Sequence, residues 1–72
     1  MVPMKKLITI IIPSFNEEKS LPFLFKRLTN LSAKVRDYDL EFLFIDDGSR
    51  DNTLKILQQE AARNPRISYL SF

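Results

Sequence analysis

The sequence contains no cysteine and no histidine among its 72 residues. Without cysteine there is no disulfide framework and no thiolate metal site. Without histidine the usual zinc ligand and the usual base at neutral pH are also missing. These two absences exclude the mechanisms that depend on either side chain.

Glycine is almost absent as well, because Gly48 is the only one. Neither of the two common phosphate-binding motifs, GxGxxG and GxxxxGK[ST], can be formed with a single glycine. A dinucleotide bound through the first motif and a nucleotide bound through the second are therefore excluded.

Long apolar runs and an excess of one charge are missing too. The longest run, from Leu7 to Pro13, is interrupted by Thr9 and is far shorter than the roughly 20 residues of a membrane span. No small-residue cleavage site follows it, so we interpret it as a buried strand rather than a signal peptide. The 11 basic and 9 acidic residues nearly balance, and the bases are scattered singly or in pairs. We therefore do not expect nucleic acid as a partner.

Three apolar segments indicate β-strands, at residues 7–12, 40–45 and 67–72. The first two show no regular alternation of apolar and polar residues and are rich in β-branched and aromatic residues, which is typical of parallel strands buried on both faces. The third alternates apolar residues with serine and stops at the chain end, so we interpret it as an edge strand with one solvated face or as an unfinished strand.

A helix fits into each interval between these strands. We expect Ser20 to cap the first helix, with Pro22 in its first turn and an apolar face made of Phe23, Leu24, Leu28, Leu31 and Val35. We expect Asp51 or Ser49 to cap the second helix, and Asn64 and Pro65 to end it. Its apolar side would be Leu54, Ile56, Leu57 and Ala61, and its polar side Gln58, Gln59, Glu60 and Arg63.

The order βαβαβ with short connections predicts an α/β fold with a parallel three-stranded sheet and right-handed crossovers. Such a unit is one half of a Rossmann-like domain. Residues 1–72 show no linker and no repeat, so we expect a single unit.

Two polar turns follow the first two strands, at residues 13–18 and 46–53, where open parallel sheets bind their ligands. Asp46 and Asp47 repel each other without helping the core, so we predict a function for at least one of them. Carboxylates accept hydrogen bonds from a base or a ribose, or coordinate a divalent cation. Structural roles remain open for other residues of these turns: a helix cap for Asp51, a tight turn for Gly48 and packing for Phe15.

The strings IIIPSFNEE at residues 10–18 and FIDDGSRDNT at residues 44–53 resemble, in order and spacing, the opening of glycosyltransferase family 2. The polyprenyl-phosphate branch is most similar, which includes dolichol-phosphate mannosyltransferases and bactoprenol glucosyltransferases. The resemblance implies a GT-A nucleotide-sugar-binding domain. Matched by position, the nucleotide-sugar-binding residues would be Pro13, Phe15, Glu17, Ile45 and Asp47, and those supporting the turns Asn16, Asp46 and Gly48.

The resemblance also implies roles for single residues. Asp47 would accept hydrogen bonds from the base or its neighbourhood, and Glu17 would bind near the ribose. Phe15 stands where the family often has tyrosine, so it keeps the ring and lacks the hydroxyl.

Family members carry a DxD metal-binding motif, the acceptor site and the catalytic base after the third strand, with which this chain ends. The resemblance thus implies an N-terminal fragment that has no catalytic residue, binds no metal alone and is inactive in transfer. The complete enzyme would use Mg²⁺ or Mn²⁺ to move a sugar from a UDP- or GDP-linked donor to an acceptor such as a polyprenyl phosphate. It would be cytoplasmic, at the inner face of the membrane.

Two other functions remain open at this point: a receiver-like acidic phosphoacceptor module, and a structural fragment with no specific ligand. Unpaired strand edges and uncovered sheet faces favour association. We therefore also expect the chain to self-associate, through pairing of residues 67–72.

Overall fold

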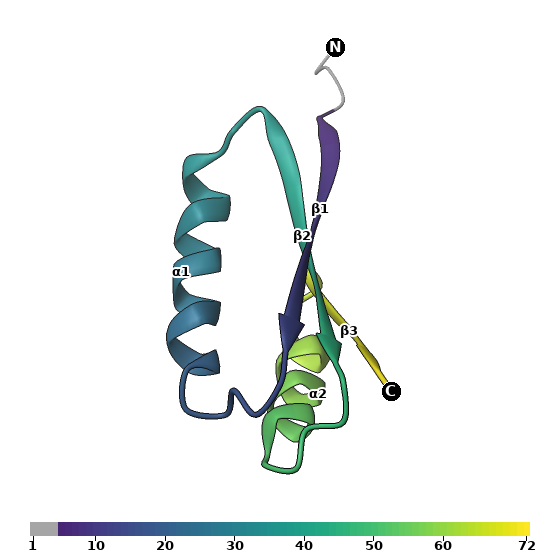
Figure 1. Cartoon of the computed structure of the whole chain (residues 1–72). Coiled ribbons are helices and arrows are strands. Elements are labelled where there is room, and N and C mark those ends of the chain that lie inside the picture. Colours follow the sequence, from purple (N-terminus) through teal and green to yellow (C-terminus); the bar gives the residue numbers. More distant parts are fainter. Residues whose placement is uncertain (1–4) are drawn as a thin grey trace.

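Five elements alternate along the chain in the computed structural model, which describes residues 5–72 (Figure 1). They are β1 (Lys6–Ser14), α1 (Leu21–Lys34), β2 (Tyr38–Asp46), α2 (Thr53–Arg63) and β3 (Ile67–Ser71). The strands are parallel and lie in the order β1-β2-β3. The predicted βαβαβ fold is confirmed. No helix within residues 5–72 has the length and apolar character needed to cross a membrane.

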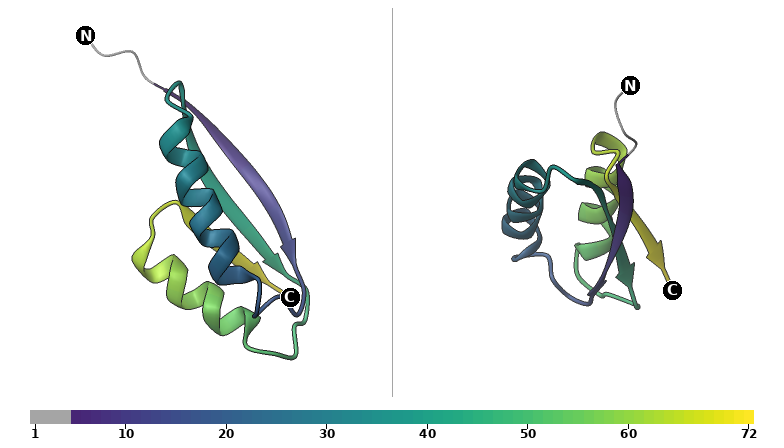
Figure 2. Two further views of the ribbon diagram at one scale, coloured as in Figure 1. Left: turned by 90° about the vertical axis from the view of Figure 1, so that its left-hand side faces the viewer. Right: turned by 90° about the horizontal axis from the view of Figure 1, so that it is seen from above.

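Both helices cover the same face of the sheet (Figure 2). Two crossovers of one hand that step in the same direction across a sheet bring their helices to one side. The residues buried between sheet and helices are Leu21, Phe25, Leu40, Phe42, Phe44, Leu57 and Ile67. At the centre, the rings of Phe25 and Phe44 meet edge to face with centroids 5.5 Å apart. This layer is the core.

The prediction that the first two strands are buried on both faces is wrong. β1 lies at an edge of the sheet, and Leu7 and Ile11 are 62% and 63% exposed. Along β2, fully buried residues alternate with half-buried ones. The reason is the one-sided placement of the helices, which leaves the second face of the sheet, here called the open face, uncovered. The prediction that β3 is an edge strand is confirmed.

The apolar face predicted for α1 is only partly right. Leu24, Leu28 and Val35 contact the core, but Phe23 is 71% exposed and Leu31 is 40% exposed. The fully buried residues of α1 are Leu21 and Phe25 instead. Because successive residues turn by about 100°, Phe23 lies on the side of the helix opposite Leu21.

The N-cap predicted for α1 has the right position, whereas the one predicted for α2 does not. Ser20 occupies the N-cap of α1, but its hydroxyl makes no cap bond and instead donates to the Glu17 carboxylate at 2.8 Å. The N-cap of α2 is Asn52, although the Asp51 carboxylate still accepts from the first helical N–H, that of Thr53, at 2.9 Å. The predicted C-terminal end of this helix, at Asn64, is confirmed.

Glu60 was expected on the polar side of α2, but it is only 8% exposed. Its Oε1 accepts from Nε of Arg63 at 2.7 Å and lies 2.6 Å from Nη2 of the same side chain. The one-turn spacing brings the two side chains together, so the carboxylate is buried with a partner.

Candidate functional site

The two polar turns lie side by side at the carboxyl edge of the sheet. β1 and β2 are paired over their whole length, from Lys6 opposite Tyr38 to Ser14 opposite Asp46, so both strands end at the same level. The turn that leads into α1 and the turn that leads into α2 therefore start from neighbouring points, at the bottom of Figure 1.

Asn16 joins the two turns with its backbone and its side chain. Its backbone N–H donates to Ser49 Oγ at 3.0 Å, and its side-chain Oδ1 accepts from the backbone N–H of Arg50 at 2.9 Å. Asn16 has a φ of 52° and Gly48 a φ of 72°, the left-handed conformation that these two residue types tolerate best. Each turn thus reverses at a residue suited to it.

Two more contacts continue this connection toward the helices. The backbone N–H of Glu17 donates to Thr53 Oγ1 at 2.7 Å, and that of Glu18 donates to Asp51 Oδ2 at 3.3 Å. Thr53 is completely buried at the first position of α2. The turn after β1 is therefore fixed by side chains of the turn after β2, and we call these contacts the cross-turn hydrogen bonds.

Asp51 is a charged anchor within this connection. The hydroxyl of Thr53 beside it lowers the pKa of the Asp51 carboxyl below its ordinary value, and the backbone N–H groups of Thr53 and Glu18 add to the effect. A carboxylate that accepts several hydrogen bonds is stabilised in its ionised form. Its role in the structure is to hold the turns, as well as the start of α2.

The adjacent residues Asp46 and Asp47 have different surroundings. Asp46 is 2% exposed, and its carboxylate accepts from the backbone N–H of Ser49 at 3.3 Å and from the Ser71 hydroxyl at 3.4 Å. Asp47 is exposed to solvent. Since neighbouring residues of a strand end point to opposite sides, the Asp46 carboxylate supports the turn and the Asp47 carboxylate is open to solvent.

A hollow of about 530 Å³ lies where these turns meet the open face of the sheet. Pro13 and Ile45 are opposite one another in the strand register and form part of its wall. The lining residues are Pro13, Ser14, Phe15, Glu17, Ile45 and Asp47. The structure thus brings together all five residues matched to nucleotide-sugar binding. Ser14 was missed, although its position between Pro13 and Phe15 could have indicated it.

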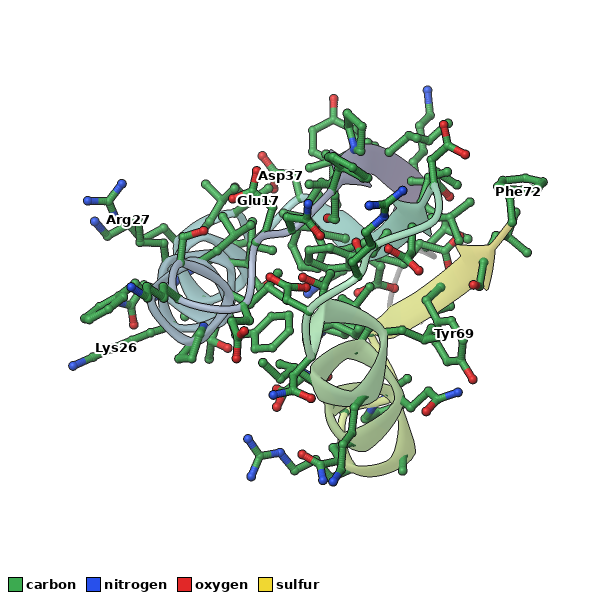
Figure 3. The ribbon with its side chains drawn as sticks, turned by 60° about the horizontal axis from the view of Figure 1, so that its bottom comes forward. Glu17, Lys26, Arg27, Asp37, Tyr69 and Phe72 are labelled. Carbon is green, nitrogen blue, oxygen red and sulfur yellow. The ribbon has the colours of Figure 1, made fainter. Side chains whose placement is uncertain are left out.

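The hollow combines an apolar wall with two carboxylates. Phe15 is 55% exposed, so one face of its ring is available for stacking. Glu17, in the turn between β1 and α1, is also exposed (Figure 3). Such a surface can stack a planar ring and accept hydrogen bonds from N–H and O–H groups. It offers no cation to a phosphate.

The carboxylates at this edge do not form a metal centre of their own. Within residues 5–72, no group of three or more acidic, histidine or cysteine side chains is placed to hold an ion. Asp46 already accepts two hydrogen bonds on the helix side, whereas Asp47 lies on the other side. The carboxylates of Asp46 and Asp47 therefore do not point toward a common ion site.

A larger hollow, of about 640 Å³, lies between α1 and α2. Its one carboxylate, that of Glu60, is already paired with Arg63. Because it lies away from the strand ends and its carboxylate is already paired, it does not compete with the carboxyl-edge hollow as the candidate site.

The fold and the hollow together define a class of protein: a parallel α/β domain with a hollow at its strand ends that is lined by carboxylates and an aromatic ring. The sequence-family model described as "Glycosyl transferase family 2" matches residues 9–72 of the chain. The chain belongs to glycosyl transferase family 2. The sequence resemblance to this family is confirmed.

Curated relatives agree with this assignment. The chain is 44% identical over 59 residues to an undecaprenyl-phosphate 4-deoxy-4-formamido-L-arabinose transferase of Pseudomonas savastanoi pv. phaseolicola, which covers 82% of this chain and 17% of the relative. It is 35% identical over 65 residues to a prophage bactoprenol glucosyl transferase homolog of Escherichia coli, covering 90% of this chain and 21% of the relative. A bactoprenol glucosyl transferase of Shigella phage SfX matches with the same identity and coverage. These names confirm the likeness to the polyprenyl-phosphate branch.

The chain spans about a fifth of the length of these relatives.

Proposed function

We propose that the chain is the nucleotide-binding portion of a glycosyltransferase that moves a sugar from a nucleotide-diphospho-sugar to a polyprenyl phosphate. The observation that carries this proposal is the hollow at the carboxyl edge, whose lining includes the five residues matched to the family's nucleotide-contacting turns. Residues 1–72 would form one part of a larger catalytic domain. Taken alone, this part would bind a nucleotide and transfer nothing.

In the bound state, the ring of Phe15 would stack on the base, and Asp47 would accept a hydrogen bond from a base N–H group. Uracil presents one such group on its pairing edge and guanine presents more, so a UDP-linked or GDP-linked donor fits the same acceptor. Glu17 would accept from ribose hydroxyls. Because both carboxylates repel anions, the diphosphate would extend away from Glu17 and Asp47.

The chain's own residues bind and orient the donor, and none of them is proposed as a catalytic base. A phosphate acceptor is already a nucleophile and needs no base, which suits a polyprenyl phosphate. In the complete enzyme, neutralisation of the leaving diphosphate by Mg²⁺ or Mn²⁺ would be provided by groups other than those of this hollow.

The acceptor and the location are proposed from the relatives. The names of these relatives specify undecaprenyl phosphate and bactoprenol, and both kinds of relative match most of this chain. We therefore propose a lipid-linked acceptor, and a cytoplasmic catalytic domain at the inner face of the membrane. The buried state of Asp46, with its two hydrogen bonds, disfavours the receiver-like alternative, which needs an accessible acidic pair.

Titration of the 72-residue chain with UDP and with GDP, each with and without Mg²⁺, tests the proposal by calorimetry and by ¹⁵N-correlation NMR. We expect shifts at residues 13–17 and 45–48. Asp47→Ala should weaken binding by about 10- to 100-fold, the loss of a hydrogen bond to a charged acceptor.

Asp37→Ala is the matched control, because Asp37 is an exposed carboxylate in the loop between α1 and β2, at the other end of the sheet. It should bind as the wild type does. Equal affinity of the Asp47→Ala and wild-type chains, or an equal loss in both variants, would contradict the assigned site.

A further inference from the structure

Helix α1 and its flanks carry charge of one sign only. Between Glu18 and Asp37 the sequence has five basic residues and no acidic one. The five are Lys19, Lys26, Arg27, Lys34 and Arg36. The near-neutral total of the chain conceals this segment, because most carboxylates lie in β2 and in the turns at the carboxyl edge.

The fold places three of these bases on one outward surface. Leu21 and Phe25 turn the apolar side of α1 toward the sheet, so the opposite side of the helix faces solvent. Lys26, Arg27 and Lys34 are exposed there, and Figure 3 shows Lys26 and Arg27 projecting from α1 away from the strands and α2.

An aromatic side chain lies among these cations. Phe23 is 71% exposed, and the spacing of residues 23, 27 and 34 puts Phe23, Arg27 and Lys34 on one side of the helix. We define the basic α1 face as Phe23, Lys26, Arg27 and Lys34.

Nothing in the described part of the chain neutralises this face. The one ion pair within residues 5–72 joins Arg63 to Glu60, both on α2. α2 therefore mixes charges of both signs, as a solvated helix surface usually does, whereas α1 carries adjacent like charges and an exposed ring without compensation.

We propose that the basic α1 face binds the surface of an anionic lipid bilayer. Lysine and arginine side chains meet the negative headgroups, and the phenyl ring enters the boundary between headgroups and acyl chains. A nucleic acid would use the cations but would have no use for Phe23 at this position, so the bilayer is the better match. Three cations at such a surface strengthen binding on the order of 100-fold.

This contact is separate from the proposed nucleotide site. The hollow opens on the open face of the sheet, whereas α1 covers the other face. A bilayer held against α1 would leave the hollow accessible to a water-soluble donor. The inference does not rest on nucleotide binding, and either can fail alone.

Co-sedimentation of the 72-residue chain with vesicles tests whether the cations of the basic α1 face bind anionic headgroups. We expect binding to vesicles of phosphatidylcholine with about 30% phosphatidylglycerol, weak binding to pure phosphatidylcholine, and release at about 0.5 M NaCl. Lys26→Glu/Arg27→Glu should lower the partition coefficient more than 20-fold. Lys5→Glu/Lys6→Glu makes the same change in net charge at exposed positions outside α1 and should lower it less than fivefold.

Tryptophan fluorescence tests whether residue 23 enters the bilayer. The chain has no tryptophan of its own, so a single introduced tryptophan reports its own surroundings. Phe23→Trp should shift its emission to the blue on phosphatidylglycerol vesicles. Phe72→Trp, at a 76% exposed position beyond β3, should not (Figure 3).

Four results would overturn the inference. The first is no binding to anionic vesicles, and the second is equal effects of the two double variants. The third is a blue shift at residue 72 alone, which would assign the contact to the open face. The fourth is tighter binding to a 20-base-pair DNA duplex that is unchanged in Phe23→Ser, which would make α1 a general polyanion surface.

Discussion

Removal of the Thr53 hydroxyl should destabilise the whole chain. Thr53 is completely buried, and its Oγ1 accepts the backbone N–H of Glu17 at 2.7 Å. Thr53→Val keeps the shape of the side chain and leaves that N–H without an acceptor, at a cost of about 1–3 kcal/mol. A chain of 72 residues has a total stability of about 4–11 kcal/mol at the usual value per residue. The expected loss is therefore a large share of the total free energy of unfolding.

Urea unfolding followed by circular dichroism measures the loss, and thermal unfolding should show a Tm lower by about 4–20 °C. Thr53→Ser is the matched control, because it keeps the hydroxyl and loses one buried methyl group, at about 1 kcal/mol. The NMR signal of the Glu17 amide should move in Thr53→Val and stay close to its place in Thr53→Ser. The reasoning is refuted if Thr53→Ser is less stable than Thr53→Val, or if the NMR signal of the Glu17 amide moves in neither variant.

Three further predictions concern other parts of the chain. Gly48→Ala should cost about 1 kcal/mol, from the positive φ alone, because a Cβ there meets nothing within 4 Å; a loss above about 3 kcal/mol in urea unfolding would contradict this. The lowered pKa of Asp51 adds stability that is complete above its ordinary value of 3.8 and disappears as the pH falls through the lowered value. The stability advantage of the wild type over Asp51→Asn should therefore shrink below that pH, and a constant difference would count against the anchor role. Finally, the unpaired edge of β3 and the exposed Leu70 and Phe72 predict self-association, seen as a mass above 8.5 kDa that rises with concentration in analytical ultracentrifugation; a monomer at all concentrations would refute it.

The strands and their parallel order could be predicted because their signals are local. Residues 7–12 and 40–45 are apolar runs that end at polar turns, and a connection containing one helix forces the next strand to run parallel. By the same argument, the polar turns after β1 and β2 are predicted to lie side by side, because parallel neighbouring strands end at the same edge of the sheet. The co-location of Phe15, Glu17 and Asp47 in one hollow was expected from the family resemblance, which supplied the residues that composition does not single out.

What could not be predicted depends on which faces are covered. The run from Leu7 to Ile12 has apolar residues on both sides, and no local signal shows that both helices lie on one face of the sheet. Phe23 is as apolar as Phe25, so the helical period alone does not show which of them meets β2. The hydrogen bonds of the predicted caps could not be predicted either, because the Asp51 carboxylate also accepts from Glu18 of the other turn and the Ser20 hydroxyl donates to Glu17 of its own turn.

The cross-turn hydrogen bonds have a consequence for how the site appears during folding. They join residues 33 to 36 positions apart, and each contact needs one turn from each half of the chain. Neither βα unit can assemble the hollow by itself, so an intermediate with only one unit folded would have no binding site. Ligand binding by this chain would thus arise in a single step with the pairing of β1 and β2, and the ligand would add its binding free energy to that step.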